Sequence, residues 1–368
     1  MITHGELDKL RSIRAPEESI LSLYLRVPLD PAGLHELPAR ASDLIRAAAS
    51  APSQQRATDE LVARNAVAGH ARQRLGQTLA IFVCSDLGLL EVVPLPGASC
   101  ERAVWAVRPH VRPLLAVLQR HPDHRVVVID RRHAWLFLVT SDGIATVAST
   151  TDEQARSAAT GGWHGLESDH VQRRMKEIAR HHYREAAVVL ADALHRWGPQ
   201  PLVIGGQADS IKHLLTALSP AVHDQYAGCF AADPNVLTPA RAAELAAPVI
   251  ARRAELQERQ LVQQIAGQTS GVRAAIGLNG CLAAVNAEVV DLLLIGDEGT
   301  VPGYHCERCG VLSVTGEECC DWGAASRAVP DLLEEMALRT LANDGEVIAA
   351  RELTTTAIAA RLRPQAID

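Results

Sequence analysis

The segment from residue 161 to residue 184 carries the side chains whose types and spacing are best suited to specific chemistry. It opens with a glycine-rich turn that has an aromatic side chain at its tip: Gly161, Gly162, Trp163, His164 and Gly165. Between His170 and Arg184 it has five Arg or Lys residues against one Glu. Phosphate contacts supply most nucleic-acid affinity, and the planar fork of arginine binds phosphate oxygens in pairs. A short glycine-rich loop followed by a basic helix is therefore suited to bind in a phosphate-lined cavity. The alternative is that the segment is only a surface loop ahead of an amphipathic helix.

A single long helix from about 166 to 197 would position these cations. Its apolar residues recur at steps of three, four or eight and would form one buried stripe: Val171, Met175, Ile178, Ala186, Val189, Ala193 and Trp197. The predicted RNA-binding set is Arg173, Arg174, Lys176, Arg180 and Arg184. Gly198-Pro199 predicts the end of the helix, because Gly adopts the left-handed cap conformation and Pro cannot continue a helix.

The second group with possible chemistry is a set of four cysteines between residues 302 and 324: Cys306, Cys309, Cys319 and Cys320. The first two, followed by Gly310, have the spacing of a zinc knuckle. The last two are adjacent, and Trp322 stands where a fourth ligand is expected. Asp321 or His305 could complete a site. The pattern leaves open both a structural zinc site and a loop with unliganded thiols.

Composition predicts a globular protein with more than one domain. The chain has 368 residues, of which 48% are hydrophobic and 21% charged, and this length exceeds one ordinary core. Because its net charge is −7, any nucleic-acid contact must come from local basic patches. The first residues do not read as a leader peptide, and no apolar run reaches the roughly 18 residues of a membrane span. We therefore expect a cytoplasmic protein without membrane contact.

Three α/β domains are expected, at 1–121, 122–250 and 251–368. Runs of β-branched and aromatic residues predict strands at 20–27, 79–84, 125–130, 134–139, 144–147, 201–204, 226–230, 289–295 and 346–350. Besides 166–197, helices are predicted at 38–75, 208–218, 239–265, 273–286 and 329–342. Residues 131–133 are predicted to be a turn. The last domain is expected to be an α/β/α sandwich that carries the cysteine insertion at 302–324 in the manner of a zinc ribbon.

The order of these segments resembles a known family. An early Ser-Leu-Tyr-Leu strand at 22–25 is followed by the glycine loop at 161–165 with its basic helix. A Leu-Val-Ile-Gly-Gly strand end at 202–206 and a terminal α/β/α domain with a cysteine insertion come after it. In this order the whole chain is similar to the bacterial relatives of the archaeal and eukaryotic class-one release factors and of Pelota. The resemblance implies a ribosome-binding factor whose glycine loop reaches the peptidyl-transferase centre.

The glycine loop departs from the family pattern at the position that hydrolysis requires. Release factors of this family carry Gly-Gly-Gln in this loop, whereas the chain has Gly161-Gly162-Trp163. An indole has one N–H donor and no acceptor, so it cannot orient a water molecule as an amide can. It can stack on a base, a contact worth about 1–3 kcal/mol in single-stranded sites. The sequence therefore favours a binding tip over a hydrolytic one.

A Gly-Gly-Gln tripeptide does occur at Gly205-Gly206-Gln207, but it follows the strand after the basic helix. There a glycine pair is expected to end a buried strand and to let the next helix pack closely. The elements with which the family reads stop codons, Asn-Ile-Lys-Ser and Tyr-x-Cys-x-x-x-Phe, do not occur in the sequence. Codon-specific termination is therefore not expected.

Three functions stay open. The first is a ribosome-binding factor without hydrolase activity that occupies the A site and protects idle ribosomes during stress. The second is an enzyme, a ribosome-rescue peptidyl-tRNA hydrolase working through His164, Gln172 or the loop backbone. The third is an unrelated α/β protein whose Gly-Gly turns are structural. We favour the first, and we leave open whether hydrolase activity accompanies it.

The resemblance also implies partners. The glycine loop and the basic helix would contact 23S ribosomal RNA and the P-site tRNA, with no role for DNA. In relatives the last domain docks a translational GTPase, which implies a partner such as elongation factor Tu. Bound zinc would be structural, since nothing near the cysteines suggests an open catalytic position.

Overall fold

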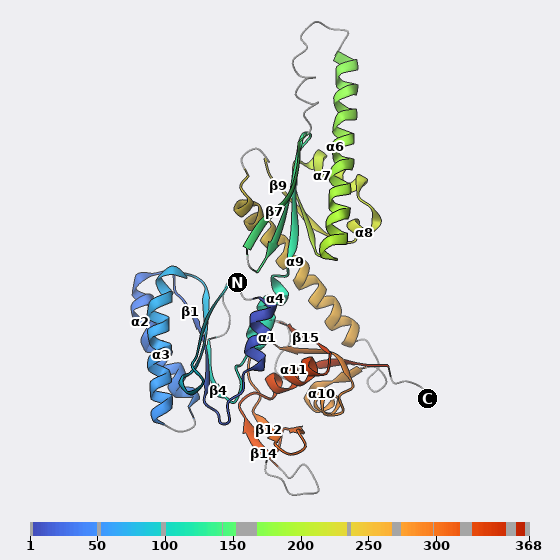
Figure 1. Ribbon diagram of the computed structural model, residues 1–368. Coiled ribbons are helices and arrows are strands. Elements are labelled where there is room, and N and C mark those ends of the chain that lie inside the picture. Colours follow the sequence, from blue (N-terminus) through green and yellow to red (C-terminus); the bar gives the residue numbers. More distant parts are fainter. Residues whose placement is uncertain are drawn as a thin grey trace. The chain divides into compact units, whose positions relative to one another are not determined.

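The computed structural model describes residues 3–49, 53–96, 101–141, 143–151, 168–233, 237–266, 274–296, 298–316, 326–350 and 358–364. The chain forms two compact units (Figure 1): unit 1 combines Met1–Gln119 with Gln257–Asp368, and unit 2 is Arg120–Leu256. Both units combine helices with sheets, which confirms the predicted α/β class. The domain boundaries at 121 and 250 stay a prediction. Among the described helices, none is long and apolar enough to cross a bilayer.

The first sheet of unit 1 is antiparallel, with the strand order β3-β2-β1-β4. Its strands are β1 (Ile20–Arg26), β2 (Thr78–Cys84), β3 (Leu89–Leu95) and β4 (Arg102–Ala106). β1 and β2 are buried along almost their whole length, as their unbroken apolar runs predict. Helices α2 (Pro31–Ala48) and α3 (Gln54–His70) pack on one face, and short 3-10 helices follow at Ala71–Gln73 and Ser85–Leu87.

The helical stretch predicted at 38–75 is therefore two helices. Ser53 starts the second one, because its side chain accepts a hydrogen bond from the N–H of Arg56 and satisfies a donor of the first turn. The alanine-rich run has no break in its composition, so the cap at Ser53 was not predicted.

The second sheet of unit 1 has the order β10-β16-β11-β15, in which only β11 and β15 are parallel neighbours. Its strands are β10 (Ala274–Ile276), β16 (Ala359–Leu362), β11 (Val290–Gly296) and β15 (Glu346–Ala350). Helices α10 (Gly277–Asn286) and α11 (Leu332–Ala342) pack on one face, and the end of α9 (Pro239–Ala266) packs on the other. Helices on both faces make this the α/β/α sandwich that the sequence predicts.

Two helices of this sandwich begin later than predicted. Residues 274–276 form β10, so the helix predicted from 273 begins at Gly277, where a φ of +77° turns the chain. Val329 ends a strand, and α11 begins after Asp331, whose carboxylate accepts a hydrogen bond from the N–H of Leu333. In both cases a short strand that pairs with a distant segment precedes the helix.

A small third sheet, of order β13-β12-β14, lies in the region of the predicted cysteine insertion. Its strands are β12 (Gly303–Cys306), β13 (Leu312–Ser313) and β14 (Ser326–Val329). β12 and β13 fall within the predicted bounds of 302–324, and β14 follows them directly.

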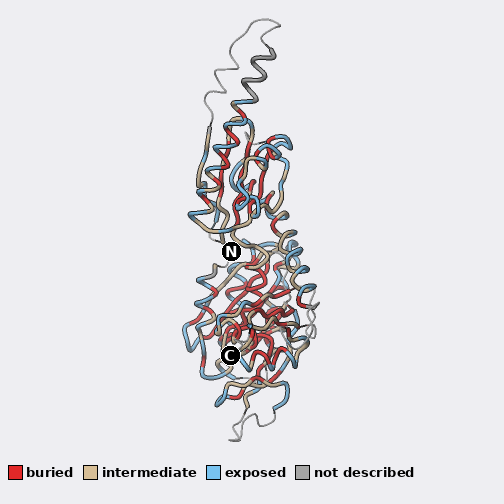
Figure 2. The backbone as a smooth tube through the Cα atoms, turned by 90° about the vertical axis from the view of Figure 1, so that its right-hand side faces the viewer, coloured by how far each residue is buried: buried red, intermediate tan, exposed pale blue. Residues whose placement is uncertain are grey.

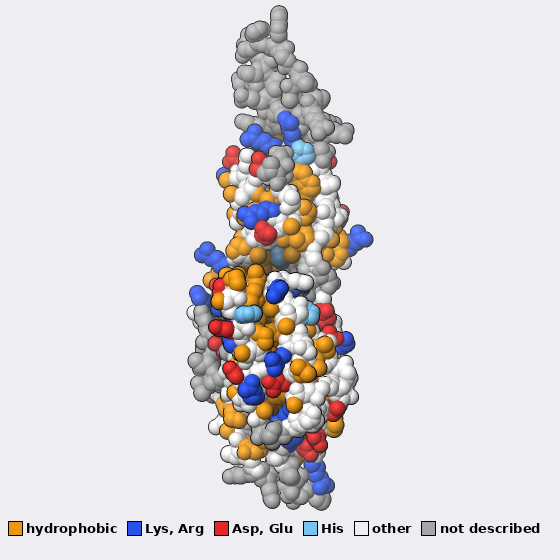
Figure 3. All heavy atoms as spheres, turned by 90° about the vertical axis from the view of Figure 1, so that its left-hand side faces the viewer, with side chains coloured by type: hydrophobic (Ala, Val, Ile, Leu, Met, Phe, Trp, Pro, Cys, Tyr) orange, Lys and Arg blue, Asp and Glu red, His pale blue; other side chains and the backbone are white. Residues whose placement is uncertain are grey.

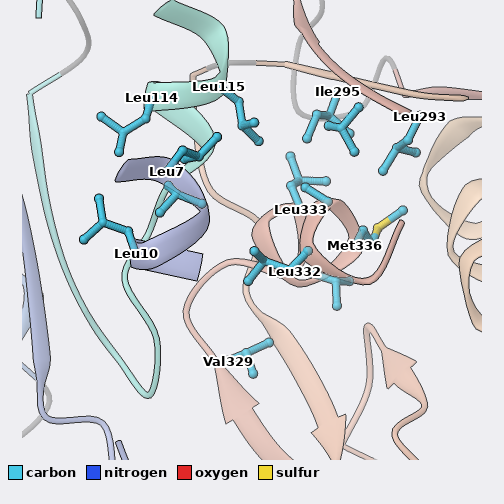
Figure 4. Close-up of a cluster of buried hydrophobic side chains, with 14 of the residues drawn as sticks. Leu7, Leu10, Leu114, Leu115, Leu293, Ile295, Val329, Leu332, Leu333 and Met336 are labelled. Carbon is cyan, nitrogen blue, oxygen red and sulfur yellow. The ribbon is translucent and has the colours of Figure 1, made fainter. Parts of the chain in front are cut away.

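One hydrophobic core joins the two ends of the chain within unit 1 (Figure 4). The helices α1 (His4–Ser12) and α4 (Arg112–Arg120) pack into it against β11 and α11. Its side chains, each at most 7% exposed, include Leu7, Leu10, Leu114, Leu115, Leu293, Ile295, Leu332, Leu333 and Met336. The N-terminal and C-terminal segments therefore fold as one body.

Unit 2 has three layers around a sheet of order β7-β6-β5-β8-β9. Its strands are β5 (His124–Ile129), β6 (His133–Thr140), β7 (Gly143–Thr151), β8 (Leu202–Gly206) and β9 (Tyr226–Ala231). β5, β8 and β9 are parallel, whereas β5, β6 and β7 form an antiparallel meander. Helices α6 (Ser168–Trp197), α7 (Ala208–Ala217) and α8 (Pro220–His223) cover one face and the first part of α9 covers the other. Buried residues accordingly concentrate along the strands and the inner sides of the helices (Figure 2).

Candidate nucleic-acid interface

Helix α6 is the predicted basic helix, and its bounds of Ser168 and Trp197 agree with the predicted 166 and 197. The glycine loop, residues 161–165, lies outside the described residues, as do the side chains of Arg173, Arg174 and Lys176. Of the predicted RNA-binding set the structure describes the side chains of Arg180 and Arg184, and both are exposed. Because they are four residues apart, they lie on one face of the helix.

The buried face of α6 explains why a helix forms here. Buried residues recur at steps of three or four: Ala179, Tyr183, Ala186, Leu190 and Ala193. The predicted stripe is displaced from this face, because Ile178 and Val189 are only half-buried. The helix ends as predicted at Gly198, which has a φ of +72° and donates its N–H to the carbonyl of Leu194 at 2.9 Å.

Tyr183 fixes the part of α6 that carries Arg180 and Arg184, called here the basic part of α6, against α7. Its hydroxyl donates to Oγ of Ser210 at 3.1 Å, and its ring stacks on His213 with centroids 5.4 Å apart. Burial raises the pKa of Tyr183, while the hydrogen bond with Ser210 and the positive charge of Arg131 oppose the rise. The phenol therefore stays a neutral donor at physiological pH. Arg180 and Arg184 flank this anchored residue, so their backbone positions are held by the core of unit 2.

The turn between β5 and β6 is a second basic element, whose cationic role the sequence analysis missed. Oδ1 of Asp130 accepts hydrogen bonds from the N–H groups of Arg132 and His133, each at 2.6 Å. This fixes the turn and leaves Arg131 exposed. Ile129 and Ala134, which flank the turn, pack in the same hydrophobic cluster as Tyr183, so the turn lies beside the basic part of α6. The sequence signal was two adjacent arginines at the end of a buried strand, which we interpreted only as a turn.

An aromatic pair adjoins this turn. The ring of His133 stacks on Trp135 with centroids 5.3 Å apart and an interplanar angle of 16°. Figure 3 shows Arg and Lys side chains gathered at one end of unit 2, with a histidine beside them. Exposed guanidinium groups on a rigid sheet-and-helix frame are suited to bind phosphate oxygens, which makes this surface a candidate nucleic-acid interface.

The Gly205-Gly206-Gln207 tripeptide occupies a packed position at the end of β8. A Cβ atom on Gly205 would lie 2.5 Å from the ring of Phe230, and one on Gly206 would lie 2.4 Å from the carbonyl oxygen of Ile129. Gln207 stands immediately before α7. The glycines end a buried strand, as predicted, but the close approach that they allow is to β5 and β9 and not to the following helix.

The knuckle around Cys306 and Cys309 has the turn that a metal site of this type needs. Cys306 is buried at the end of β12 and Cys309 is exposed. The N–H of Gly310 donates to the carbonyl of Cys306 at 2.9 Å, and Gly310 has a φ of +73°. Cys319 and Cys320, with Asp321, lie outside the described residues. The turn between Cys306 and Cys309 matches the predicted knuckle, and bound zinc stays a prediction.

His305, the other predicted auxiliary ligand, is half-buried next to this knuckle. Burial lowers the pKa of His305, and the positive charges of Arg327 and Arg14 lower it further. His305 as a zinc ligand stays a prediction, because the described His305, Cys306 and Cys309 are not among the residues whose ligand atoms lie within 4.8 Å of one another.

We expect replacement of both Cys306 and Cys309 by Ser to abolish zinc binding and to lower the melting temperature of unit 1, because a structural zinc site contributes directly to folding. Metal analysis of protein purified under reducing conditions measures the first effect and calorimetry the second. Cys229→Ser, an exposed thiol of unit 2, is the control and should keep the zinc content unchanged. Protein that never contains zinc would refute the metal site.

A second cluster with metal-like spacing lies in unit 1. The ligand atoms of His110, Asp331 and Glu334 are within 4.8 Å of one another, and all three side chains are buried. However, Nη2 of Arg112 donates to Oδ2 of Asp331 at 2.6 Å and supplies the positive charge that a metal would bring. The remaining carboxylate oxygens accept backbone N–H groups from Val111, Arg112, Val301 and Leu333. The residues therefore fit a hydrogen-bonded network rather than a metal site.

This buried network ties the start of α4 to the start of α11. Nε2 of His110 lies 2.9 Å from Oδ2 of Asp331, and Arg112 also donates to the carbonyl of Gly296. Burial alone would raise the pKa of Asp331, but the hydrogen bond from His110 and the charge of Arg112 hold it below its usual range. Burial raises the pKa of Glu334. No sequence motif points to these residues, which we did not single out.

The central part of the chain matches a known protein family. Residues 109–264 match bacterial archaeo-eukaryotic release factor family 10. No curated protein sequence matches the chain. Among solved structures, the archaeal translation termination factor aRF1 is 13% identical, covers 98% of this chain and 96% of its own, and has a TM-score of 0.25. The archaeal Pelota in a model bound to the ribosome with ABCE1 is 16% identical, with 98% and 94% covered and a TM-score of 0.42. Dom34 of S. cerevisiae, a termination-like factor that interacts with Hbs1, is 10% identical, with 79% and 81% covered and a TM-score of 0.40.

Proposed function

We propose that this chain, whose residues 109–264 match a bacterial archaeo-eukaryotic release factor family, is a ribosome-binding factor that uses unit 2 to contact ribosomal RNA. The observation that carries the proposal is the exposed pair Arg180 and Arg184 on α6, held beside the Arg131 turn by the anchored Tyr183. Such a surface offers several guanidinium groups at fixed positions. Binding to RNA requires such a local cluster of basic residues, because the chain as a whole carries a net charge of −7.

In this function the chain occupies the A site and places residues 161–165 near the peptidyl-transferase centre. In the sequence, Arg173, Arg174 and Lys176 stand between that loop and the pair Arg180 and Arg184. The partners are 23S ribosomal RNA and the P-site tRNA. The role is protection of idle ribosomes during stress, as for the hibernation factor Balon, which the chain resembles in domain order. An elongation-factor-Tu-like GTPase is proposed as the partner of the C-terminal segment, by analogy alone.

Trp163 supports binding without hydrolysis. It stands where release factors carry glutamine, and its indole offers a donor and a stacking surface but no acceptor to orient an attacking water. The competing function, a ribosome-rescue peptidyl-tRNA hydrolase, would need His164, Gln172 or the loop backbone to take over that role.

Co-sedimentation of the purified chain with vacant and with peptidyl-tRNA-loaded ribosomes tests the proposal, with released peptide scored in the same tubes. Binding without release supports an occupancy factor. Binding with release identifies the hydrolase instead. Absence of binding to both ribosome preparations, with a known ribosome-binding protein as positive control, would refute ribosome binding.

Replacing Trp163 with Ala is expected to weaken binding to vacant ribosomes about tenfold, because stacking on a base contributes about 1–3 kcal/mol. Trp163→Phe keeps an aromatic face and should retain most of the affinity. Sedimentation titrations of the two variants give the comparison. Equal affinity of the Ala variant and the original chain would exclude stacking as the role of this residue.

A further inference from the structure

A cavity of about 220 Å³ lies in unit 1, between α11 and the turn that carries the cysteine knuckle. Arg108, His305, Glu335 and Arg339 contribute its polar side chains, and Gly310 lies at its wall. At about 30 Å³ per water molecule, the space corresponds to roughly seven waters. It is thus large enough for a small polyatomic ion that keeps part of its hydration, and too small for a nucleotide.

Arg108 is the side chain in this cavity that is available to a ligand. It is half-buried, and among the described residues it makes no hydrogen bond or ion pair. Arg339 is already engaged, because Nη1 donates to the carbonyl of Gly310 at 2.6 Å and Nη2 lies 3.1 Å from a carboxylate oxygen of Glu288. Arg339 therefore shapes the wall, while Arg108 offers a half-buried guanidinium whose donors are unused. The charge of Arg108 acts on Glu335, which lines the same cavity. Its guanidinium donors nevertheless have no hydrogen-bond acceptor among the described residues, and unsatisfied, partly buried donors favour a bound acceptor.

His305 supplies a second unused group. Its Nδ1 is buried and has no hydrogen-bond partner within the described part of the chain. In the tautomer with the proton on Nδ1, this atom is a donor that lines the same cavity as Arg108. A cation would be repelled by the guanidinium groups, whereas an oxyanion would satisfy both donors.

Further positive charge surrounds the cavity. The charges of Arg14 and Arg327 act on both His305 and Glu335, so both arginines lie near it. Arg14 is exposed, whereas Arg327 is shared with Glu18 and Glu307. Glu335 is the one acid among the lining residues, and burial raises its pKa in spite of the neighbouring arginines. Its negative charge is thus disfavoured where it stands, and it opposes an anion only to the extent that it is ionised.

We propose that this cavity binds a small tetrahedral oxyanion of the phosphate class, with Arg108 as its principal ligand and Nδ1–H of His305 as a second donor. The planar fork of Arg108 matches two oxygens of such an ion, which a single ammonium group would not. The shared chemistry is a phosphoryl group, from inorganic phosphate or from a small phosphomonoester. The site is separate from the RNA-contacting surface of unit 2, so it can exist whether or not the chain binds ribosomes.

The test is calorimetric titration of the full chain with inorganic phosphate and, in a separate arm, with phosphoserine, at constant ionic strength. Arg108→Gln should weaken binding about tenfold or more, because hydrogen bonds to charged groups contribute about 1.5–3 kcal/mol. Glu335→Gln should strengthen binding, since it removes the one negative charge from the lining. Arg64→Gln, an exposed arginine of α3, should leave the affinity unchanged.

The two arms identify the source of the phosphoryl group. Binding of phosphate but not of phosphoserine assigns a free anion, and tighter binding of phosphoserine assigns a phosphomonoester. Absence of binding in both arms, or equal affinity of Arg108→Gln and the original chain, overturns the proposal. Weaker binding by Glu335→Gln would also overturn it, because that result would make the acid a ligand of a cation or a support of the fold. Ribosome co-sedimentation of the same proteins keeps this result distinct from the proposed function.

Discussion

Replacement of Asp331 by Ala is expected to destabilise unit 1 by about 3–5 kcal/mol, the usual cost of removing one partner from a buried ion pair. Asp331 is 2% exposed, and Arg112 beside it is fully buried. Without the carboxylate, Arg112 keeps its charge in the interior and His110 loses its partner at 2.9 Å. The N–H groups of Val301 and Leu333 also lose their acceptor. Because α11 begins at this carboxylate, its first turn should fray.

Calorimetric unfolding of the full chain measures the effect, since two compact units can give separate transitions. The transition of unit 1 should shift to lower temperature while that of unit 2 stays in place. Asp43→Ala is the matched control, because Asp43 forms an exposed pair with Arg46 at 3.9 Å and should have no measurable effect. A wild-type-like unit 1 transition in the Asp331 variant would show that the network adds nothing to stability.

A double-mutant cycle separates the network from simple loss of packing. Arg112→Met alone should be strongly destabilising, because it leaves the carboxylate of Asp331 buried without its guanidinium partner. Arg112→Met together with Asp331→Leu should cost less than the sum of the single changes, since no uncompensated charge then remains. Additive single effects would contradict direct coupling across the 2.6 Å contact.

The pH dependence of stability follows from the direction of the two carboxyl shifts. The pKa of Asp331 is below its usual value of 3.8, so its contribution is present above that pH and is lost as pH falls through the lower folded value. The pKa of Glu334 is raised by burial above 4.5, so its ionisation lowers stability as pH rises from 4.5 through the folded value. Asp331→Asn should therefore remove the loss of stability that occurs as pH falls, and unfolding measurements below pH 4 would detect this difference.

Segments with a strong local signal could be predicted from the sequence. β1, β2, β5 and α9 begin and end within a few residues of their expected bounds, because apolar runs and helical periodicity end at Pro, Gly or Asp. α6 is the clearest case, since Gly198 has the left-handed conformation that its place before Pro199 predicts. The α/β class follows from such segments alone.

Features that depend on distant pairing could not be predicted. β10 has three residues and is a strand only because it pairs with β16 near the other end of the chain. The core shared by Leu7 and Met336 joins residues more than 300 positions apart, and no local pattern records it. The same holds for His110 and Asp331, whose types are ordinary surface residues until the fold buries them together.

The candidate nucleic-acid interface could be predicted only in part, because one of its two basic elements depends on contacts between distant segments. Arg180 and Arg184 were found because helical spacing places them on one face. Arg131 was missed because its nearness to Tyr183 depends on how the β5–β6 hairpin sits beside α6. The signal that could have found it is the pair Arg131-Arg132 directly after a buried strand. In an open α/β sheet, the carboxyl ends of parallel strands are where ligands bind.

Reversal of charge at Arg180 and Arg184 is expected to reduce the affinity for vacant ribosomes by about two orders of magnitude. Each lost phosphate contact removes an attraction and lowers the slope of log affinity against log salt by about 0.7 to 0.9. The double variant Arg180→Glu with Arg184→Glu should therefore bind weakly and with a shallower salt dependence. Because both side chains are exposed, the fold should be retained, which circular dichroism verifies.

Arg131→Glu is expected to weaken binding by a further factor of about ten in the same assay, since its turn adds a guanidinium to the surface that α6 presents. Arg196→Glu is the matched control. It lies on the same helix but about 18 Å farther along the axis than Arg184, at 1.5 Å per residue. It should not change the affinity or the salt slope, because it stands outside the basic part of α6. An equal loss in the Arg196 variant would point to a non-specific charge effect. Unchanged affinity in the Arg180/Arg184 variant would remove the observation on which the proposed function rests.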